Sequence, residues 1–587
     1  MKKYYQYIEK FIFPLILLIY PLRHIRFGVE WWDTGYNYGN FLFMDQMDPM
    51  WMFSTYLGTA LGNLMTKLPF GNYMIGLNVY TGLLVSILAL ICYYFFIKMV
   101  KIPPVFAFLG QWMAISLCWC PTALLYNYLT YLFMGLAVIC LYIALDREKK
   151  CFFVLAGICL AINVFVRFPN LAEMGFILAV WAYGFLQKRK IKEVVQQTLY
   201  CILGYVAGLL AGLIYISLRY GLKEYISALL RLFSMPQEAS DYTIYSMLLG
   251  QIENYQYNFR WILYFLFFTI LGIIGFLILS KKFLWIKKIG YVCCVWLSFY
   301  YLMMRNMFNL DYTTKMSVFQ WAIFILSATL FMGIVQIFRK NVDNREKLIW
   351  GLCILIILIT PLGSNNHLYS SVNNLFFVAP FTFYMLYLGL KSMKETIEIK
   401  GIKIHSFPIK AMIICISIML MIQGTLFGFI YVFQESNGGE NLNTKIENND
   451  ILRGMYTDEE RAKVLTGLST YVKKEGLRGK EVILYGYIPS LSYYLEMPFA
   501  ITSWPDLRSY NYEVMEQDLN VILEEAGTKE GEYPIILLEK KYGDFLVDSE
   551  NETIKEDAKF ALLMSFIEQG EYEIDYENEK FVLLRVF

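Results

Sequence analysis

Long apolar stretches alternate with short polar segments over the first 433 residues of the chain. Several of these stretches approach the roughly 20 residues that an α-helix needs to cross a bilayer about 30 Å thick. The apolar stretches cover residues 7–22, 73–97, 105–119, 126–145, 151–165, 171–186, 199–218, 261–279, 289–304, 318–337, 348–361, 375–390 and 409–433. The pattern predicts a polytopic α-helical membrane protein with about 13 transmembrane helices.

Basic residues gather in every second polar segment, for example in segments 188–190 and 391–403, whereas segment 363–371 has none. Lys2 and Lys3 precede the first apolar stretch, and no small-residue cleavage site follows it. Because basic loops stay in the cytoplasm, we expect a multi-pass protein of the cytoplasmic membrane. Its N-terminus would lie inside and the chain after residue 433 outside.

Two polar segments on the predicted outer side are long, residues 23–72 and 219–260. Within the first, apolar side chains recur at near-helical spacing over 50–68. This spacing predicts one or two helices that lie on the membrane surface.

The chain changes character after residue 433, so we divide it into a membrane domain (1–433), a polar linker (434–450) and a small extracytoplasmic α/β domain (451–587). A capping-box pattern over Thr457-Asp458-Glu459-Glu460 starts one predicted helix of that domain. We predict helices over 457–475, 512–525 and 556–568, strands over 481–487 and 533–539, and a hairpin over 572–576 and 580–587. The domain has no glycine-rich phosphate loop, and the chain has no internal repeat.

Composition sharpens this picture. The chain is 57% hydrophobic and 17% charged, unlike an ordinary soluble protein. The net charge of +2 hides about 31 acidic and 16 basic residues after residue 432, and no basic stripe suggests nucleic acid as a partner. All eleven cysteines precede Phe433, so the C-terminal domain has no disulfide framework.

The segment 30–38 places two carboxylates among aromatic side chains at the predicted membrane edge. Asp33 is the candidate catalytic base, able to take a proton from a hydroxyl, with Glu30 as a second acid. Either carboxylate could instead bond backbone N–H groups at a helix start. Tyr36 is a candidate sugar-binding ring. Asp45 and Asp48, in the same outer segment, are weaker candidates for the catalytic acid.

Two arginines, Arg167 and Arg305, are predicted at outer ends of spans, where a guanidinium could bind phosphate. The alternative is an arginine that reaches lipid headgroups. Asn365, Asn366 and His367 form a polar outer segment suited to sugar hydroxyls, or else a solvated turn. No His/Cys cluster has zinc-ligand spacing, so any metal ion would have to rest on carboxylates.

A short first span, an acidic motif early in the first long outer loop, surface helices after it and an outer C-terminal domain resemble the GT-C glycosyltransferases. The chain is most similar to their protein mannosyltransferase and lipid A aminoarabinose transferase branch. The motif that carries the resemblance is Trp32-Asp33-Thr34-Gly35-Tyr36. Family members often have two adjacent acids here, whereas this chain has Asp33-Thr34, with Glu30 three residues before Asp33.

The resemblance implies an inverting transfer of sugar from a polyprenyl-phosphate donor, with Asp33 as base. The partners would be membrane lipid, the lipid-linked sugar and a glycan, lipid or protein acceptor. Whether the reaction uses a divalent metal ion stays open. One alternative is a transporter or flippase of lipid-linked sugars, which predicts polar residues deep in spans and repeated halves. The spans are mostly free of charge, with Glu173 an exception. Another alternative is a non-catalytic assembly protein of the cell envelope.

Overall fold

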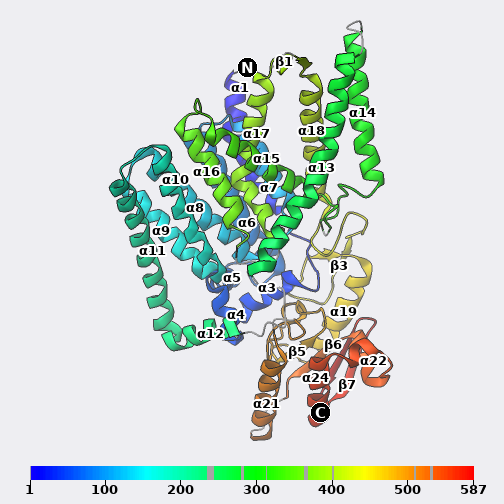
Figure 1. Ribbon diagram of the computed structural model, residues 1–587. Coiled ribbons are helices and arrows are strands. Elements are labelled where there is room, and N and C mark those ends of the chain that lie inside the picture. The colour runs from blue at the N-terminus through cyan, green and yellow to red at the C-terminus, as the bar shows by residue number, and fades with distance from the viewer. Residues whose placement is uncertain are drawn as a thin grey trace.

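The computed structural model describes residues 2–234, 244–278, 283–312, 314–362, 368–399, 402–507, 510–528 and 533–587. This part of the chain is mostly helical, with a small sheet near the C-terminus. Figure 1 shows a layer of long helices, with the N-terminus at one end and the C-terminal sheet beyond the other.

Helices make up nearly all of the described chain before residue 431. In chain order they are α1 (Lys2–Tyr7), η1 (Ile8–Ile12), α2 (Phe13–Ile19), η2 (Tyr20–Leu22), α3 (Asp33–Leu42), η3 (Met44–Gln46), α4 (Pro49–Ser54), α5 (Tyr56–Thr66), α6 (Met74–Phe95), η4 (Phe96–Val100), α7 (Pro104–Leu117), α8 (Leu125–Arg147), α9 (Lys150–Val166), η5 (Phe168–Ile177), α10 (Leu178–Leu186), α11 (Ile191–Tyr220), α12 (Leu222–Ser234), α13 (Ile244–Ile278), α14 (Leu284–Met304), α15 (Phe319–Phe338), α16 (Asn344–Ile359), η6 (Ser370–Asn374), α17 (Leu375–Ser392) and α18 (Phe407–Ile430). The only strands in this described part are β1 (Thr396–Ile399) and β2 (Ile402–His405), which form a hairpin. In Figure 1 the hairpin lies at the same end of the helices as the N-terminus.

Within the described residues, seven helices are long and apolar enough to cross a membrane. The apolar helices α7 and α9 are shorter. Large apolar side chains point outward along the long helices, such as Leu218, which is 85% exposed on α11. Such side chains are expected where a helix faces lipid rather than water. The segments that we expected to span are helical, but the count of about 13 crossings stays a prediction.

The segment 219–260, predicted as a loop, is largely helical where the structure describes it. Helix α12 and the first half of α13 lie in it. The apolar side of α12 packs on the short helix α4, where the rings of Tyr225 and Phe53 lie 5.2 Å apart. Helices α4 and α5 confirm the helices predicted over 50–68.

The C-terminal domain joins a four-stranded sheet to several helices. Its elements are β3 (Thr444–Lys445), β4 (Tyr456–Thr457), α19 (Glu459–Lys474), β5 (Val482–Tyr485), α20 (Leu491–Leu495), α21 (Tyr512–Thr528), β6 (Ile535–Glu539), α22 (Lys540–Val547), α23 (Glu552–Lys555), α24 (Ala558–Gln569), β7 (Glu573–Glu577) and β8 (Phe581–Arg585). The sheet order is β5-β6-β8-β7, with β5 and β6 parallel and the other pairs antiparallel. The predicted helices, strands and terminal hairpin are confirmed, and Asp458 caps α19 by accepting from the N–H of Arg461. The segment predicted as a linker includes buried Glu435 and Asn449.

Candidate active site around Asp33

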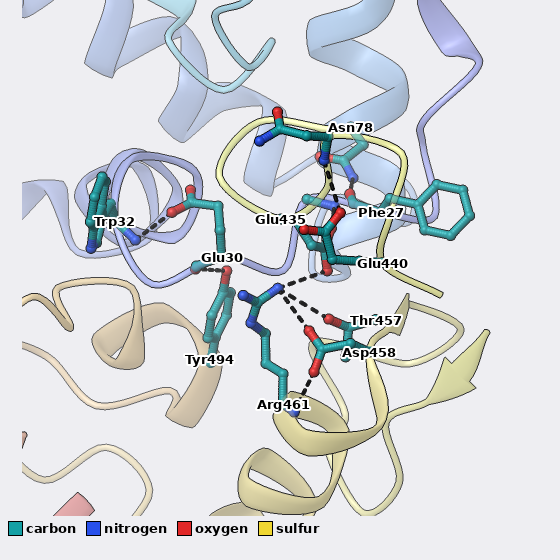
Figure 2. Close-up of polar contacts among 12 residues, drawn as sticks. Phe27, Glu30, Trp32, Asn78, Glu435, Glu440, Thr457, Asp458, Arg461 and Tyr494 are labelled. Atoms are coloured by element: carbon teal, nitrogen blue, oxygen red, sulfur yellow. Dashed lines mark hydrogen bonds and ion pairs between the residues drawn. The ribbon is translucent and has the colours of Figure 1, made fainter. Parts of the chain in front are cut away.

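Helix α3 begins at Asp33, and the carboxylate of Glu30 lies beneath its first turn. That carboxylate accepts hydrogen bonds from the backbone N–H groups of Trp32 and Thr34. Figure 2 shows the bond from Trp32. The first N–H groups of a helix have no partner within the helix, so an acid placed here completes them. Glu30 is only 1% exposed. Burial and the nearby charge of Asp33 raise the pKa of Glu30 to about 8. The hydrogen bonds from Trp32 and Thr34 lower this pKa but do not outweigh the other two effects. Glu30 thus makes the contacts expected of a structural acid that bonds backbone N–H groups at a helix start, rather than those of a catalytic acid.

Asp33 differs from Glu30 in both exposure and bonding. Its side chain is half-buried. Among the residues that the structure describes, no hydrogen bond or ion pair engages its carboxylate; the bond from the Asn37 amide goes to its main-chain oxygen. Burial raises the pKa of Asp33 to about 6. Unoccupied oxygens and a pKa near neutrality are what a general base needs.

Aromatic rings lie on both sides of Asp33 along the chain. Tyr36 follows one helical turn later and is half-buried. Burial is the main cause that raises its pKa, and the charge of Asp33 adds to the effect. The ring of Tyr36 lies 5.7 Å from that of Trp504, and the ring of Trp32 lies 5.8 Å from that of Tyr487. Rings from the C-terminal domain therefore reach the surroundings of Asp33.

Arg167 belongs to the same neighbourhood, although it is far from Asp33 in sequence. The hydroxyl of Tyr126, at the start of α8, lies within electrostatic range of both Asp33 and Arg167. Arg167 follows α9, and its backbone bonds the carbonyl of Asn163 and the N–H of Asn170. Its guanidinium is half-buried and makes no ion pair within 4 Å among the described residues. Asp33 and Arg167, neither of which makes an ion pair within 4 Å among the described residues, thus both act electrostatically on Tyr126.

The other sequence candidates are placed elsewhere or lie outside the description. Arg305 is exposed after α14, with its guanidinium over the ring of Tyr301. No hydrogen bond, ion pair or ring contact of the described chain joins it to Asp33. Asp45 is exposed, while Asp48 caps α4 and pairs with Arg231 at 2.8 Å. Asn365, Asn366 and His367 lie outside the described residues.

The C-terminal domain holds the irregular segment that leads to Asp33, a role that sequence reasoning missed. Residues 27–30 have no regular structure of their own, so their backbone groups need partners elsewhere. The bonds to this segment and its neighbours are Tyr456 N–H to Arg26 O (2.9 Å), Gly28 N–H to Glu435 Oε2 (2.6 Å), Tyr494 O–H to Glu30 O (2.6 Å), Ser490 N–H to Trp31 O (3.1 Å) and Ser490 O–H to Trp32 O (2.8 Å). The position of Asp33 thus depends on residues more than 400 positions later in the chain.

Arg461 strengthens this junction. Figure 2 shows its guanidinium beside the carboxylates of Glu435 and Asp458, at 3.5 and 3.3 Å. It also lies 5.5 Å from the centre of the Trp31 ring, within cation–π range. The end of the last membrane helix, the Asp33 segment and α19 therefore meet at one ion-paired cluster.

Replacing Tyr494 with Phe is expected to destabilise the junction by about 1–2 kcal/mol, because the buried carbonyl of Glu30 would lose its donor. Tyr493 is the matched control, since its equally buried hydroxyl has no partner among the described residues. Tyr493→Phe should be neutral or slightly stabilising. Thermal midpoints of the detergent-solubilised protein compare the two variants, and equal midpoints would contradict the assigned bond.

Metal ligands do not gather in the described part of the chain: no group of three or more His, Cys, Asp or Glu side chains that could hold a metal ion forms there.

Comparisons with known proteins do not assign the chain to a family, because neither a protein-family model nor a curated protein matches it.

Proposed function

We propose that the chain is a membrane glycosyltransferase of GT-C type. It would move a sugar from a polyprenyl-phosphate donor to an acceptor on the outer face of the cytoplasmic membrane. In this proposal the N-terminus lies inside, about 13 helices cross the membrane, and the Asp33 segment and the C-terminal domain lie outside.

The single observation that carries the proposal is the state of the Asp33 carboxylate. It is desolvated and without a short-range protein partner in the described chain, yet it is not sealed from solvent. A carboxylate kept in this state at a cost in solvation is expected where it acts on a ligand. The guanidinium of Arg167 in the same neighbourhood supports a substrate that carries phosphate.

The proposed reaction uses the two groups as a pair. Asp33 accepts the proton of an acceptor hydroxyl as that oxygen forms a bond to the anomeric carbon of the donor sugar. The bond from that carbon to the phosphate oxygen breaks, and polyprenyl phosphate leaves with the electron pair. Arg167 would stabilise the charge that grows on the departing phosphate. The attack from the opposite face inverts the anomeric centre.

The proposal is tested with the full chain reconstituted in vesicles. A panel of radiolabelled polyprenyl-phosphate hexoses, pentoses and N-acetylhexosamines is supplied as donor. We expect at least one donor to be cleaved, with free polyprenyl phosphate released in step with labelled product. If no donor is cleaved, or labelled sugar crosses the bilayer still attached to its lipid, the transferase proposal is wrong.

The transfer rate is expected to depend on pH through Asp33. Because burial raises the pKa of Asp33 to about 6, kcat/KM should rise roughly tenfold per pH unit below pH 6 and level off above it. Stability should move the other way. An acid whose pKa is raised on folding contributes fully at low pH and loses that contribution as the pH passes the folded pKa. A rate profile that levels off near pH 4 would indicate an ordinary carboxylate and contradict the assignment.

Transport of lipid-linked sugars is the second candidate, and one observation bears on it. A buried polar cluster joins Glu173, Asn163, Asn170 and Thr130, with the Asn163 amide donating to Glu173 at 2.6 Å. Buried polar residues among apolar helices often mark a transport path. Here the cluster also braces the turn that carries Arg167, since Asn163 and Asn170 bond its backbone. The cluster is therefore explained by the transferase site as well.

A further inference from the structure

A group of aromatic and charged side chains lies where the two parallel strands of the C-terminal sheet end. Tyr487 comes two residues after β5, and Lys541 two residues after β6. Gly486, with φ +114°, turns the chain between β5 and Tyr487, and a Cβ there would lie 2.5 Å from that of Glu539. Ligands of open α/β sheets bind outside the carboxyl ends of parallel strands. At this edge Tyr487 contacts Trp32, the residue before Asp33.

The rings at this edge form one connected row. Tyr487 contacts Trp32 and Trp504, and Trp504 contacts Tyr36, at centroid distances of 5.8, 6.4 and 5.7 Å. The ring planes are inclined by 48°, 81° and 60°, so none of the three pairs is stacked face to face. Tyr487 is 52% exposed, and the other three are half-buried. The row therefore remains open to a flat ligand.

Polar atoms beside the row lack partners. The indole N–H of Trp504 and one carboxylate oxygen of Asp506 are buried without a hydrogen bond among the described residues. Unsatisfied buried polar atoms in a native protein call for an explanation, and a bound ligand or water is one. The ammonium of Lys541 lies 5.3 Å from the centre of the Tyr487 ring and 3.3 Å from Glu539. Donors and acceptors thus stand next to ring faces.

We propose that the acceptor is a carbohydrate and that its terminal sugar ring packs on Tyr487 and Trp504 beside Asp33. This inference rests on the glycosyltransferase function proposed above. A pyranose has an apolar C–H face for an aromatic ring and hydroxyls at its edge for donors and acceptors. A lipid chain would be expected to require a wider apolar groove than this row of rings. Packing on this row brings an acceptor hydroxyl toward Asp33.

The first test is kinetic and uses soluble glycan acceptors with the donor found above. Tyr487→Ala should raise the KM for the acceptor at least tenfold and change kcat by less than about threefold. Tyr487→Phe keeps the ring and should behave as wild type. Tyr512 in the same domain, 39% exposed, is the matched control, and Tyr512→Ala should have no effect. An acceptor KM that is unchanged in Tyr487→Ala overturns the proposal.

The second test measures binding without turnover, so it separates this inference from the transferase proposal. Oligosaccharides of glucose, mannose and N-acetylglucosamine are titrated into the full Asp33→Asn protein while tryptophan fluorescence is followed. A saturable change that is lost when the Asp33→Asn protein also carries Tyr487→Ala supports the subsite even if donor cleavage is never observed. If a lipid or peptide acceptor is used in transfer while none of the glycans binds, the acceptor is not a carbohydrate at this row.

Discussion

Replacing Asp33 with Asn is expected to lower sugar transfer by about 10²–10⁴-fold, the range that a general base contributes. Asparagine keeps the shape of the side chain but cannot accept the hydroxyl proton at neutral pH. The expected loss falls on kcat, because the ring contacts of Trp32 and Tyr36 with the C-terminal domain do not involve the carboxylate. The measurement is single-turnover transfer from a saturating donor.

Stability separates this catalytic effect from misfolding. The carboxylate has no short-range protein partner in the described chain, and burial disfavours its charge. Asp33→Asn should therefore leave the thermal midpoint unchanged or raise it slightly at pH 8, where Asp33 is ionised. Asp45→Asn, an exposed acid in the same segment, is the matched control and should change neither rate nor stability. Transfer at the wild-type rate by Asp33→Asn would exclude the base role.

Local patterns predicted the elements of the C-terminal domain well. Continuous apolar runs marked β5 and β6, and the capping-box pattern over 457–460 marked the start of α19, although the structure caps that helix with Asp458. The strand order could not be read in the same way, because β6 pairs with β5 on one side and with β8 on the other across long stretches of chain. The short helix α20 was also missed, since five residues carry too little periodicity.

The segment 219–260 shows a different failure. Its charged residues suggested a loop, yet Leu222, Tyr225 and Leu229 recur at helical spacing and could have indicated α12. Tyr225 is 5% exposed, so this spacing reflects real packing. An amphipathic surface helix carries both charge and helical periodicity, so the polar character of the segment did not exclude a helix.

The candidate site was predicted only in part. The sequence offered a helix start as one alternative for the acid motif and named Arg167 as a candidate phosphate ligand, but nothing in one chain says that both lie within electrostatic range of Tyr126. The positions of the two acids also depend on residues that are distant in the sequence. Glu30 is fixed beneath the helix by local N–H groups, while the segment around both acids is held by Ser490 and Tyr494. One sequence carries no local signal for such a junction.

The glycine of the Trp-Asp-Thr-Gly motif, Gly35, lies at this junction. A Cβ at Gly35 would lie 2.5 Å from the Cβ and 2.8 Å from the Cα of Ser490. Contacts this short do not occur, so Gly35→Ala must push α3 away from α20. We expect a loss of about 1–3 kcal/mol in stability, measured as a lower thermal midpoint. Transfer should fall by more than tenfold, since Asp33 is two residues away.

The comparison with Gly39, one turn later on α3, decides whether this close approach matters. A Cβ at Gly39 meets its nearest neighbours at an ordinary 3.7 Å, and alanine is a better helix former than glycine by about 0.5–1 kcal/mol. Gly39→Ala should therefore be neutral or stabilising with transfer retained. Adding Ser490→Gly to Gly35→Ala removes the clashing Cβ and hydroxyl and should restore part of the midpoint. It also deletes the bond from the Ser490 hydroxyl to the Trp32 carbonyl, so full recovery is not expected. If Gly35→Ala and Gly39→Ala behaved alike, helix α20 would not position Asp33.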